Sequence, residues 1–125
     1  MTPAARLQAT LDLLSAVDST ARPADAVVAA WLRTRRHVGD ADRGRILDLL
    51  HRLLRHRARL GWWLAKLGRE DSPRNRLLAW LALADGRTPD QVERLLSGAR
   101  FAPAALTDRE HALLAGLRGS SIEHP

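Results

Sequence analysis

Arginine is the residue type in this chain with the clearest capacity for chemistry. Its planar guanidinium group can bind phosphates and base edges through two parallel hydrogen bonds. Nineteen of the twenty Lys and Arg residues are arginine, and the net charge is +6. The densest run is "RTRRHVGDADR", residues 33–43. Such a run predicts an anionic partner held in a salt-dependent way, although an excess of Arg, Ala and Leu can equally reflect a GC-rich genome.

A second group of arginines follows the stretch "ILDLLHRLLRHRARLGWWL", residues 46–64. A helical wheel places the apolar residues of this helix on an arc of about 160° that faces the core. On the opposite side, within about 80°, lie Arg45, Arg52, Arg55 and Arg59. Asp48 lies among them and is expected to pair with Arg45 and Arg52. This face is either the solvated side of a core helix, which the pattern alone favours, or an RNA contact.

Two further arginines, Arg43 and Arg57, fall inside the apolar arc near the ends of that helix. Their side chains are expected either to reach out to solvent or to bind neighbouring carbonyl and acidic groups. If Arg35, Arg36 and Arg43 converge at the corner before the helix, they form the densest positive patch in the chain. For Arg35 and Arg36 a structural role is also open, since cations near a helix C-terminus interact favourably with its dipole.

Signals for catalysis or metal binding are weak. The chain has no cysteine, which excludes disulfides, thiolate metal sites and thiol nucleophiles. His51 and His56 are five residues apart, about 140° on a helix, so they cannot hold one metal ion together. Nucleophile-elbow, phosphate-loop and zinc-protease motifs do not occur, and Asp40 and Asp42 are explained as helix-start residues. The sequence therefore predicts binding, with no catalytic residue, metal ligand or cofactor site in this chain.

The four tryptophans divide by their position on the helical stripes. Trp31, Trp63 and Trp80 lie on apolar stripes and are predicted to be core residues. Trp62 lies off the stripe beside the basic face. Its indole is expected either to stack on an unpaired base or to be buried against a neighbouring helix.

Proline, glycine and capping residues predict an all-α bundle of about seven helices joined by short loops. Thr2 with Pro3, Ser72 with Pro73 and Thr88 with Pro89 mark helix starts, Asp40 is the expected N-cap of the third helix, and a break is expected near residues 57–59. The fifth helix is apolar nearly all round and should form the buried centre. With their capping residues, the expected helices cover 2–19, 23–39, 40–57, 59–68, 72–86, 88–98 and 107–119, the last with a capping box of Thr107 and Glu110.

The length and composition fit one domain. With 125 residues and 46% apolar content, a single core is expected. Since the chain shows neither a signal-peptide pattern nor about 18 consecutive apolar residues, we expect a soluble, cytoplasmic protein. Residues 1–119 are assigned to the helical domain. The stretch "SSIEHP", residues 120–125, is interpreted as the start of a linker to a missing C-terminal domain.

Three stretches together resemble one protein family. They are "ARLQATLDLLSAV", "RRHVGDADRGRILDLLHRLLRHRARLGWWL" and "GARFAPAALTDREHALLAGLRG". In this order they resemble the N-terminal domain of the bacterial ribosomal RNA cytosine-C5 methyltransferases of the RsmB/NOP group. That domain is similar in fold to the transcription antitermination factor NusB. The resemblance covers residues 3–125 and implies a NusB-like helical bundle.

The resemblance also implies a function. In the family, this domain helps to hold ribosomal RNA, while a following Rossmann-like domain binds S-adenosylmethionine and attacks cytosine through a cysteine. The fragment would thus have no cofactor of its own, and its partners would be RNA and its own methyltransferase domain, with no membrane. The resemblance points to Arg6, Arg33, Arg35, Arg36, Arg43 and Arg45 as RNA-binding residues, and raises the prospect of RNA contact for the face of Arg52 and Arg55.

Two other functions remain open from the sequence. The chain could be a stand-alone NusB-like antitermination factor that binds RNA and a small ribosomal protein. It could also be a helical module that packs mainly on its own catalytic domain. A methyltransferase sequence following Pro125 would favour the first reading over the antitermination factor.

Overall fold

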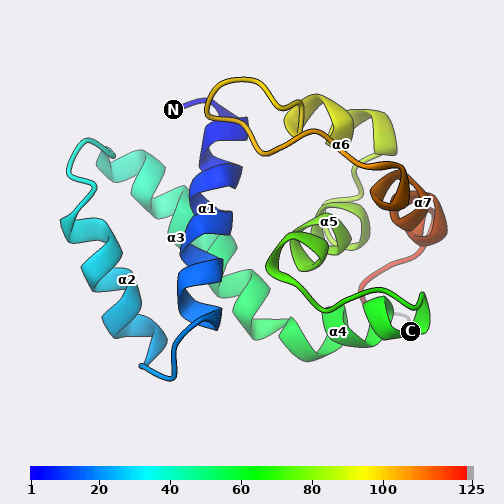
Figure 1. Cartoon of the computed structure of the whole chain (residues 1–125), viewed down its shortest axis with the longest axis horizontal. Helices are drawn as coiled ribbons and strands as arrows, with labels where there is room; N and C mark the ends of the chain where they lie inside the picture. The colour runs from blue at the N-terminus through cyan, green and yellow to red at the C-terminus, as the bar shows by residue number, and fades with distance from the viewer. Residues whose placement is uncertain (124–125) are drawn as a thin grey trace.

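The computed structural model describes residues 1–123, and this part of the chain contains seven α-helices and no strand, which confirms the predicted all-α bundle (Figure 1). None of these helices is both long and apolar enough to cross a membrane. The helices are α1 (Pro3–Asp18), α2 (Ala24–Arg33), α3 (Asp40–Arg55), α4 (Arg57–Lys66), α5 (Pro73–Leu83), α6 (Pro89–Leu95) and α7 (Asp108–Leu117).

Hydroxyl caps fix four of the helix starts, as expected from the sequence. The Thr2 and Ser72 side chains accept hydrogen bonds from backbone N–H groups at the starts of α1 and α5, and in both helices a proline follows the cap. Thr88 and Thr107 form reciprocal capping boxes with Gln91 and Glu110. Each cap satisfies backbone donors that the first helical turn leaves unpaired.

The region between α2 and α4 differs from the sequence expectation. Helix α2 ends at Arg33 instead of running on to Gly39. The Thr34 hydroxyl donates to the Trp31 carbonyl at 3.0 Å, and the Arg35 N–H donates to the Leu32 carbonyl, so a tight turn closes the helix. The N-cap of α3 is Gly39, one residue before the expected Asp40.

The helix break also lies earlier than expected, at His56 rather than at residues 57–59. Arg59 is consequently part of α4 and does not share the arginine face of α3. Its guanidinium donates to the Ile122 carbonyl at 3.4 Å.

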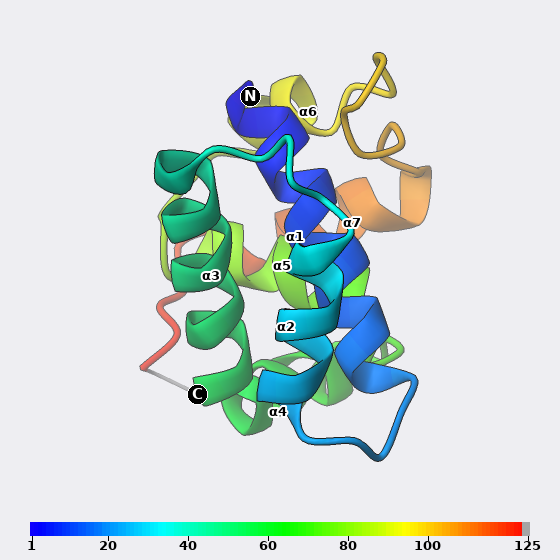
Figure 2. The ribbon, with the colours of Figure 1, turned by 90° about the vertical axis from the view of Figure 1, so that its left-hand side faces the viewer.

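Helix α1 packs against other helices on two of its sides. It contacts α2 and α3 on one side and α5 on the other. Figure 2 looks onto the first of these sides and shows α2 and α3 in front of α1. Helix α5 lies against α1, α4 and α7 and is buried over most of its length, as predicted. Trp31, Trp63 and Trp80 are all buried, which confirms their assignment to the core.

The packed part of the chain extends beyond the expected domain end at residue 119. Ile122 is buried, and its N–H donates to the Leu83 carbonyl at 3.3 Å. Residues 120–122 thus close over the end of α5. The final part of the expected linker, residues 124–125, lies outside the described residues.

A buried arginine joins the two halves of the bundle. Arg76 of α5 is only 1% exposed. Its guanidinium donates to the Asp18 carboxylate at the end of α1 and, at 2.8 Å, to the Asp71 carboxylate before α5. A side chain at Gly61 of α4 would bring its Cβ to 3.2 Å from Asp71 Oδ2, so this glycine leaves room for the carboxylate.

Substituting Arg76→Met is expected to lower the free energy of unfolding by about 3 kcal/mol, because it leaves the mostly buried Asp18 carboxylate without its main partner. Arg57→Met is the matched control, since Arg57 contacts the same carboxylate at 3.3 Å but its side chain is 51% exposed. The control should cost less than about 1 kcal/mol. Urea unfolding measures both, and equal losses would contradict the central role of Arg76.

Candidate nucleic-acid interface

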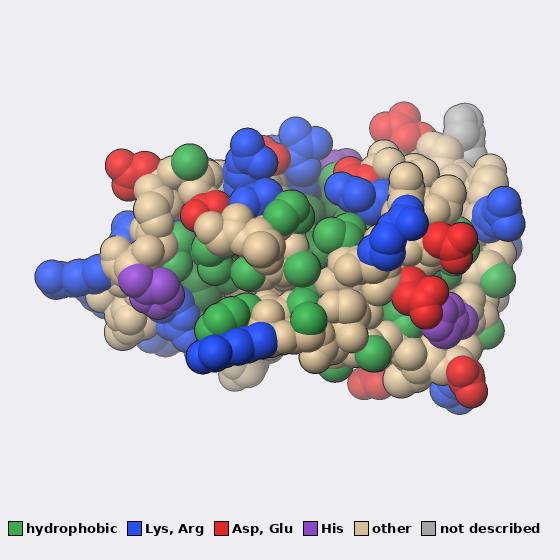
Figure 3. All heavy atoms as spheres, turned by 90° about the horizontal axis from the view of Figure 1, so that it is seen from above, with side chains coloured by type: hydrophobic (Ala, Val, Ile, Leu, Met, Phe, Trp, Pro, Cys, Tyr) green, Lys and Arg blue, Asp and Glu red, His purple; other side chains and the backbone are tan. Residues whose placement is uncertain are grey.

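The eight arginines predicted to bind RNA occupy three places in the fold. One group lies at the corner where α2 leads into α3: Arg33, Arg35, Arg36 and Arg43. A second group, Arg45, Arg52 and Arg55, lies on α3, and Arg6 lies on α1. In Figure 3, Lys and Arg side chains extend from the left-hand end of the molecule, where the corner lies.

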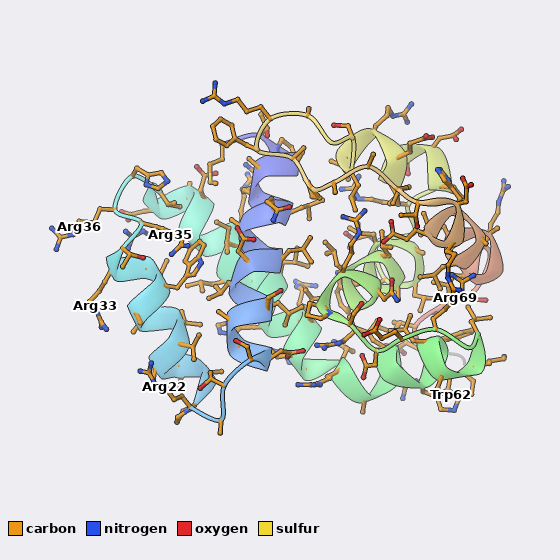
Figure 4. All side chains as sticks on the ribbon, in the orientation of Figure 1. Arg22, Arg33, Arg35, Arg36, Trp62 and Arg69 are labelled. Carbon is orange, nitrogen blue, oxygen red and sulfur yellow. The ribbon has the colours of Figure 1, made fainter. Side chains whose placement is uncertain are left out.

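Two arginines of the corner are free to bind a ligand. Arg33 and Arg36 are exposed, and neither has an acidic partner within residues 1–123. Figure 4 shows both side chains pointing away from the body of the molecule, with Arg22 at the other end of α2. Arg22 is also exposed and was not anticipated as a candidate, because it lies eleven residues before the basic run.

The other two corner arginines are used by the fold. The Arg35 guanidinium lies 4.3 Å from the ring centre of Trp31 and donates to Thr34 Oγ1 at 2.9 Å. Arg43 Nε donates to the Val38 carbonyl at 2.9 Å. Of the two alternatives for Arg43, the structure therefore shows the carbonyl contact, which braces the turn. The positive surface of the corner consists of Arg33 and Arg36, with Arg35 half-buried beside them.

Arg6 is held by an acidic neighbour. Its Nη1 donates to Asp42 Oδ1 at 3.2 Å, and the Met1 amino group lies 3.3 Å from Asp42 Oδ2. Burial raises the pKa of the Asp42 carboxyl, but hydrogen bonds and charges from the amino group and from Arg6 outweigh it, so the pKa lies below the ordinary 3.8. Arg6 thus ties α1 to the first turn of α3.

On the face of α3, one of the two expected ion pairs forms. Arg52 Nε lies 3.0 Å from Asp48 Oδ2, while Arg45 makes no ion pair with Asp48. Because both partners of the Arg52 pair are more than half exposed, it contributes at most about 0.5 kcal/mol and leaves Arg52 available. Arg45 and Arg52 line a pocket of about 270 Å³ together with Arg6 and Arg87. The pocket also contains Asp48 and Asp85, so its charge is partly neutralised.

Trp62 is exposed rather than buried against a neighbouring helix. The residue is 45% exposed, its ring packs edge-on against Trp63 at 5.2 Å, and the Lys66 ammonium lies 5.2 Å from its ring centre. Figure 4 places it on α4, at the opposite end of the molecule from Arg33 and Arg36. Trp62 and the corner therefore do not belong to one site.

The histidines and carboxylates do not form a metal centre in the part of the chain that the structure describes, where no group of three or more is arranged to hold an ion. His56 lies in structural contacts: its Nδ1 is 2.9 Å from the Arg52 carbonyl and its ring is 5.0 Å from Trp80.

An apolar groove beside the corner is the main feature that sequence reasoning missed. It measures about 530 Å³ and lies between α1, the turn after α2 and the loop from α6 to α7. Figure 1 shows this loop crossing the N-terminal end of α1. The groove joins residues 31–38 to residues 100–101, which are far apart in sequence. The sequence signal that could have indicated it is Phe101, the single phenylalanine of the chain, next to Arg100.

The loop presents Phe101 in a strained conformation. The Gly98 N–H donates to the Pro103 carbonyl at 2.9 Å and the Ala102 N–H to the Ala99 carbonyl at 3.0 Å, so the tip is a closed turn. Phe101 occupies the third position of this turn with φ +67° and is 68% exposed. Glycine is the usual residue at such a position, because a Cβ there is crowded.

Arg74 of α5 anchors the stem of this loop. Its Nη2 donates to the Ala104 carbonyl at 2.7 Å, and its guanidinium forms a bidentate pair with Glu110 of α7, with Nε 2.6 Å from Oε2. Burial raises the pKa of Glu110, but the hydrogen bonds from Arg74 and from the Thr107 N–H, with the Arg74 charge, hold it below the ordinary 4.5.

Phe101→Gly is expected to raise the free energy of unfolding by up to about 1 kcal/mol, because it removes the backbone strain while the ring contributes little burial. Thermal or urea unfolding measures the change. Phe101→Ala keeps the strain and serves as the comparison. A Phe101→Gly variant less stable than Phe101→Ala would show that φ at this position carries no strain.

Glu110→Gln is expected to lower stability by about 1 kcal/mol at pH 7, since glutamine keeps the capping box but loses the charge that Arg74 binds. Because the folded-state pKa of Glu110 is lowered, its stabilisation is complete above pH 4.5 and disappears as the pH falls through the folded value. The stabilities of the two proteins in urea unfolding should therefore converge as the pH is lowered through the folded-state pKa of Glu110. The exposed Glu93→Gln is the control, and a pH-independent difference for Glu110→Gln would contradict this account.

Comparisons of the chain with protein-family models, with curated proteins and with solved structures find no match. The likeness to NusB-like domains therefore stays a prediction from the three sequence stretches. The exposed arginines and the groove beside the corner are the features of the molecule that bear on its function.

Proposed function

We propose that this chain is the RNA-binding N-terminal domain of an S-adenosylmethionine-dependent 16S ribosomal RNA cytosine-C5 methyltransferase. In this role it binds and orients the RNA, while a C-terminal domain transfers the methyl group. The observation that carries the RNA-binding part is the pair of exposed arginines, Arg33 and Arg36, that have no acidic partner in the described chain. The methyltransferase part comes from the sequence resemblance.

The distribution of charge supports an RNA phosphate ligand at the corner. The segment of residues 33–43 contains two acidic side chains: Asp42, which is the ion-pair partner of Arg6, and the exposed Asp40, which pairs with neither Arg33 nor Arg36. Arginines without such a partner contribute their full charge to the surface potential, within a range of about 10 Å at 0.1 M salt. Arg45 and Arg55 extend this surface along α3, because both are exposed on its solvent side.

The division of labour follows from the residues that the chain contains. Covalent attack on a cytosine by a cysteine thiolate requires a cysteine, and this sequence has none. The contribution of the domain is therefore affinity and orientation, which raise the local concentration of the target RNA at a catalytic site elsewhere.

The double variant Arg33→Gln, Arg36→Gln is expected to weaken binding of 16S ribosomal RNA hairpins and to reduce the slope of log K against log salt by about 1.5 to 2 units, because two phosphate contacts are lost. Fluorescence anisotropy at several salt concentrations measures both quantities. Arg94→Gln with Arg118→Gln is the matched control. It removes the same charge from exposed positions at α6 and α7 and should leave the slope nearly unchanged.

The other two functions predict different results. A helical module that packs on its own catalytic domain would bind no hairpin even at low salt, and that outcome would overturn the RNA-binding proposal. A stand-alone antitermination factor would bind RNA through the same arginines, and the coding sequence after Pro125 would then encode no methyltransferase.

A further inference from the structure

We propose that the groove between α1, the turn after α2 and the loop of residues 98–103 is a binding site for one unpaired base of single-stranded RNA. This inference rests on the proposed RNA-binding function and specifies its ligand as a nucleotide presented outside a helix. The groove adjoins the corner, since Arg35 and His37 line it directly.

The interior of the groove suits a flat, largely apolar ring. Ala9, Val38 and Trp31 line it and are buried, with Ala5 beside them. Its volume of about 530 Å³ lies in the range of sites that hold small ligands. In Figure 3, which looks down on this end, hydrophobic side chains floor a hollow between the Lys, Arg and His side chains around it.

The polar groups of the groove suit the edge of a base. Trp31 Nε1 is buried and has no hydrogen-bond partner among the described residues. Because Nε1 is shielded from solvent and Trp63 Nε1 is equally unpaired elsewhere, the Trp31 indole, which lines the groove, serves as a reporter of its occupation and not as a donor to the base. Gln8 also lines the groove, and because its amide nitrogen donates to Asp12 at 2.8 Å, its amide oxygen is left to accept from a base amino group.

Phe101 and Arg100 provide the stacking surface. Phe101 is exposed and strained, and the Arg100 guanidinium lies 4.8 Å from its ring centre. Unpaired bases in RNA complexes stack on aromatic rings and on guanidinium planes, so this pair matches a base better than it matches an aliphatic side chain of a protein. The closed turn of residues 98–103 and its anchor at Arg74 hold the ring at the groove.

The charge around the groove suits the phosphate that a nucleotide carries. Arg35, Arg100 and His37 line it against a single carboxylate, Asp12, whose Oδ1 accepts the Gln8 hydrogen bond. An RNA strand could therefore place its base in the groove and the phosphate of the same nucleotide against Arg35 or Arg100.

The test follows the indole N–H of Trp31 by ¹⁵N NMR during titration with AMP, GMP, CMP and UMP. Trp31→Phe assigns the resonance. We expect at least one nucleotide to shift it, ribose 5-phosphate to leave it in place, and Phe101→Ala to weaken nucleotide binding about tenfold. Trp62→Ala, which removes an exposed aromatic ring at the other end of the molecule, should change nothing.

Three results would overturn the base site: no shift with any of the four nucleotides, an equal shift with ribose 5-phosphate, or unchanged binding in Phe101→Ala and Phe101→Gly. A shift caused by an acidic peptide with one bulky apolar residue, but by no nucleotide, would assign the groove to a protein partner instead. Because nucleotides are titrated separately from hairpins, loss of hairpin binding with intact nucleotide shifts contradicts only the proposed RNA-binding role. Intact hairpin binding without any nucleotide shift contradicts only the base site.

Discussion

The buried guanidinium of Arg76 is the interaction on which the arrangement of the bundle depends. A charged group that is 1% exposed must have its donors satisfied, and here the acceptors come from the last residue of α1 and from the loop before α5. The ion pairs therefore fix where α1 ends relative to the central helix. Since α1 also carries α2 and α3 on its other side, the position of the arginine corner follows indirectly from this contact.

The arginines of this protein fall into two classes that composition alone does not distinguish. Arg6, Arg43, Arg74 and Arg76 donate to carboxylates or carbonyls of other segments and act as parts of the fold. Arg33 and Arg36 have no ion-pair partner within residues 1–123 and remain available to a ligand. Fewer arginines are thus available to RNA at any one place than the net charge of +6 suggests. The location of the unpaired ones carries the functional information.

Sequence reasoning predicted the helices, and the starts of those with hydroxyl caps, because caps such as Thr2, Ser72 and Thr107 act within four residues. It predicted the core positions of Trp31 and Trp80 because both lie on apolar stripes with helical spacing. It placed the end of α2 wrongly, since the side-chain contact of Thr34 with the Trp31 carbonyl competes with continuation of the helix. It also missed the groove, because the contact between the loop of Phe101 and the N-terminal end of α1 joins residues about 90 positions apart and leaves no periodic signal.

The conformation of Phe101 connects stability with function. A phenylalanine that is 68% exposed adds little to the core, and φ +67° makes glycine the better residue for folding at that position. The closed turn and the Arg74 anchor nevertheless hold this ring beside an apolar groove that Trp31 lines. An exposed, strained ring is unfavourable in the free protein, and a flat ligand that stacks on it would offset this cost. A local cost kept at the rim of a groove is more simply explained by a ligand than by the requirements of folding.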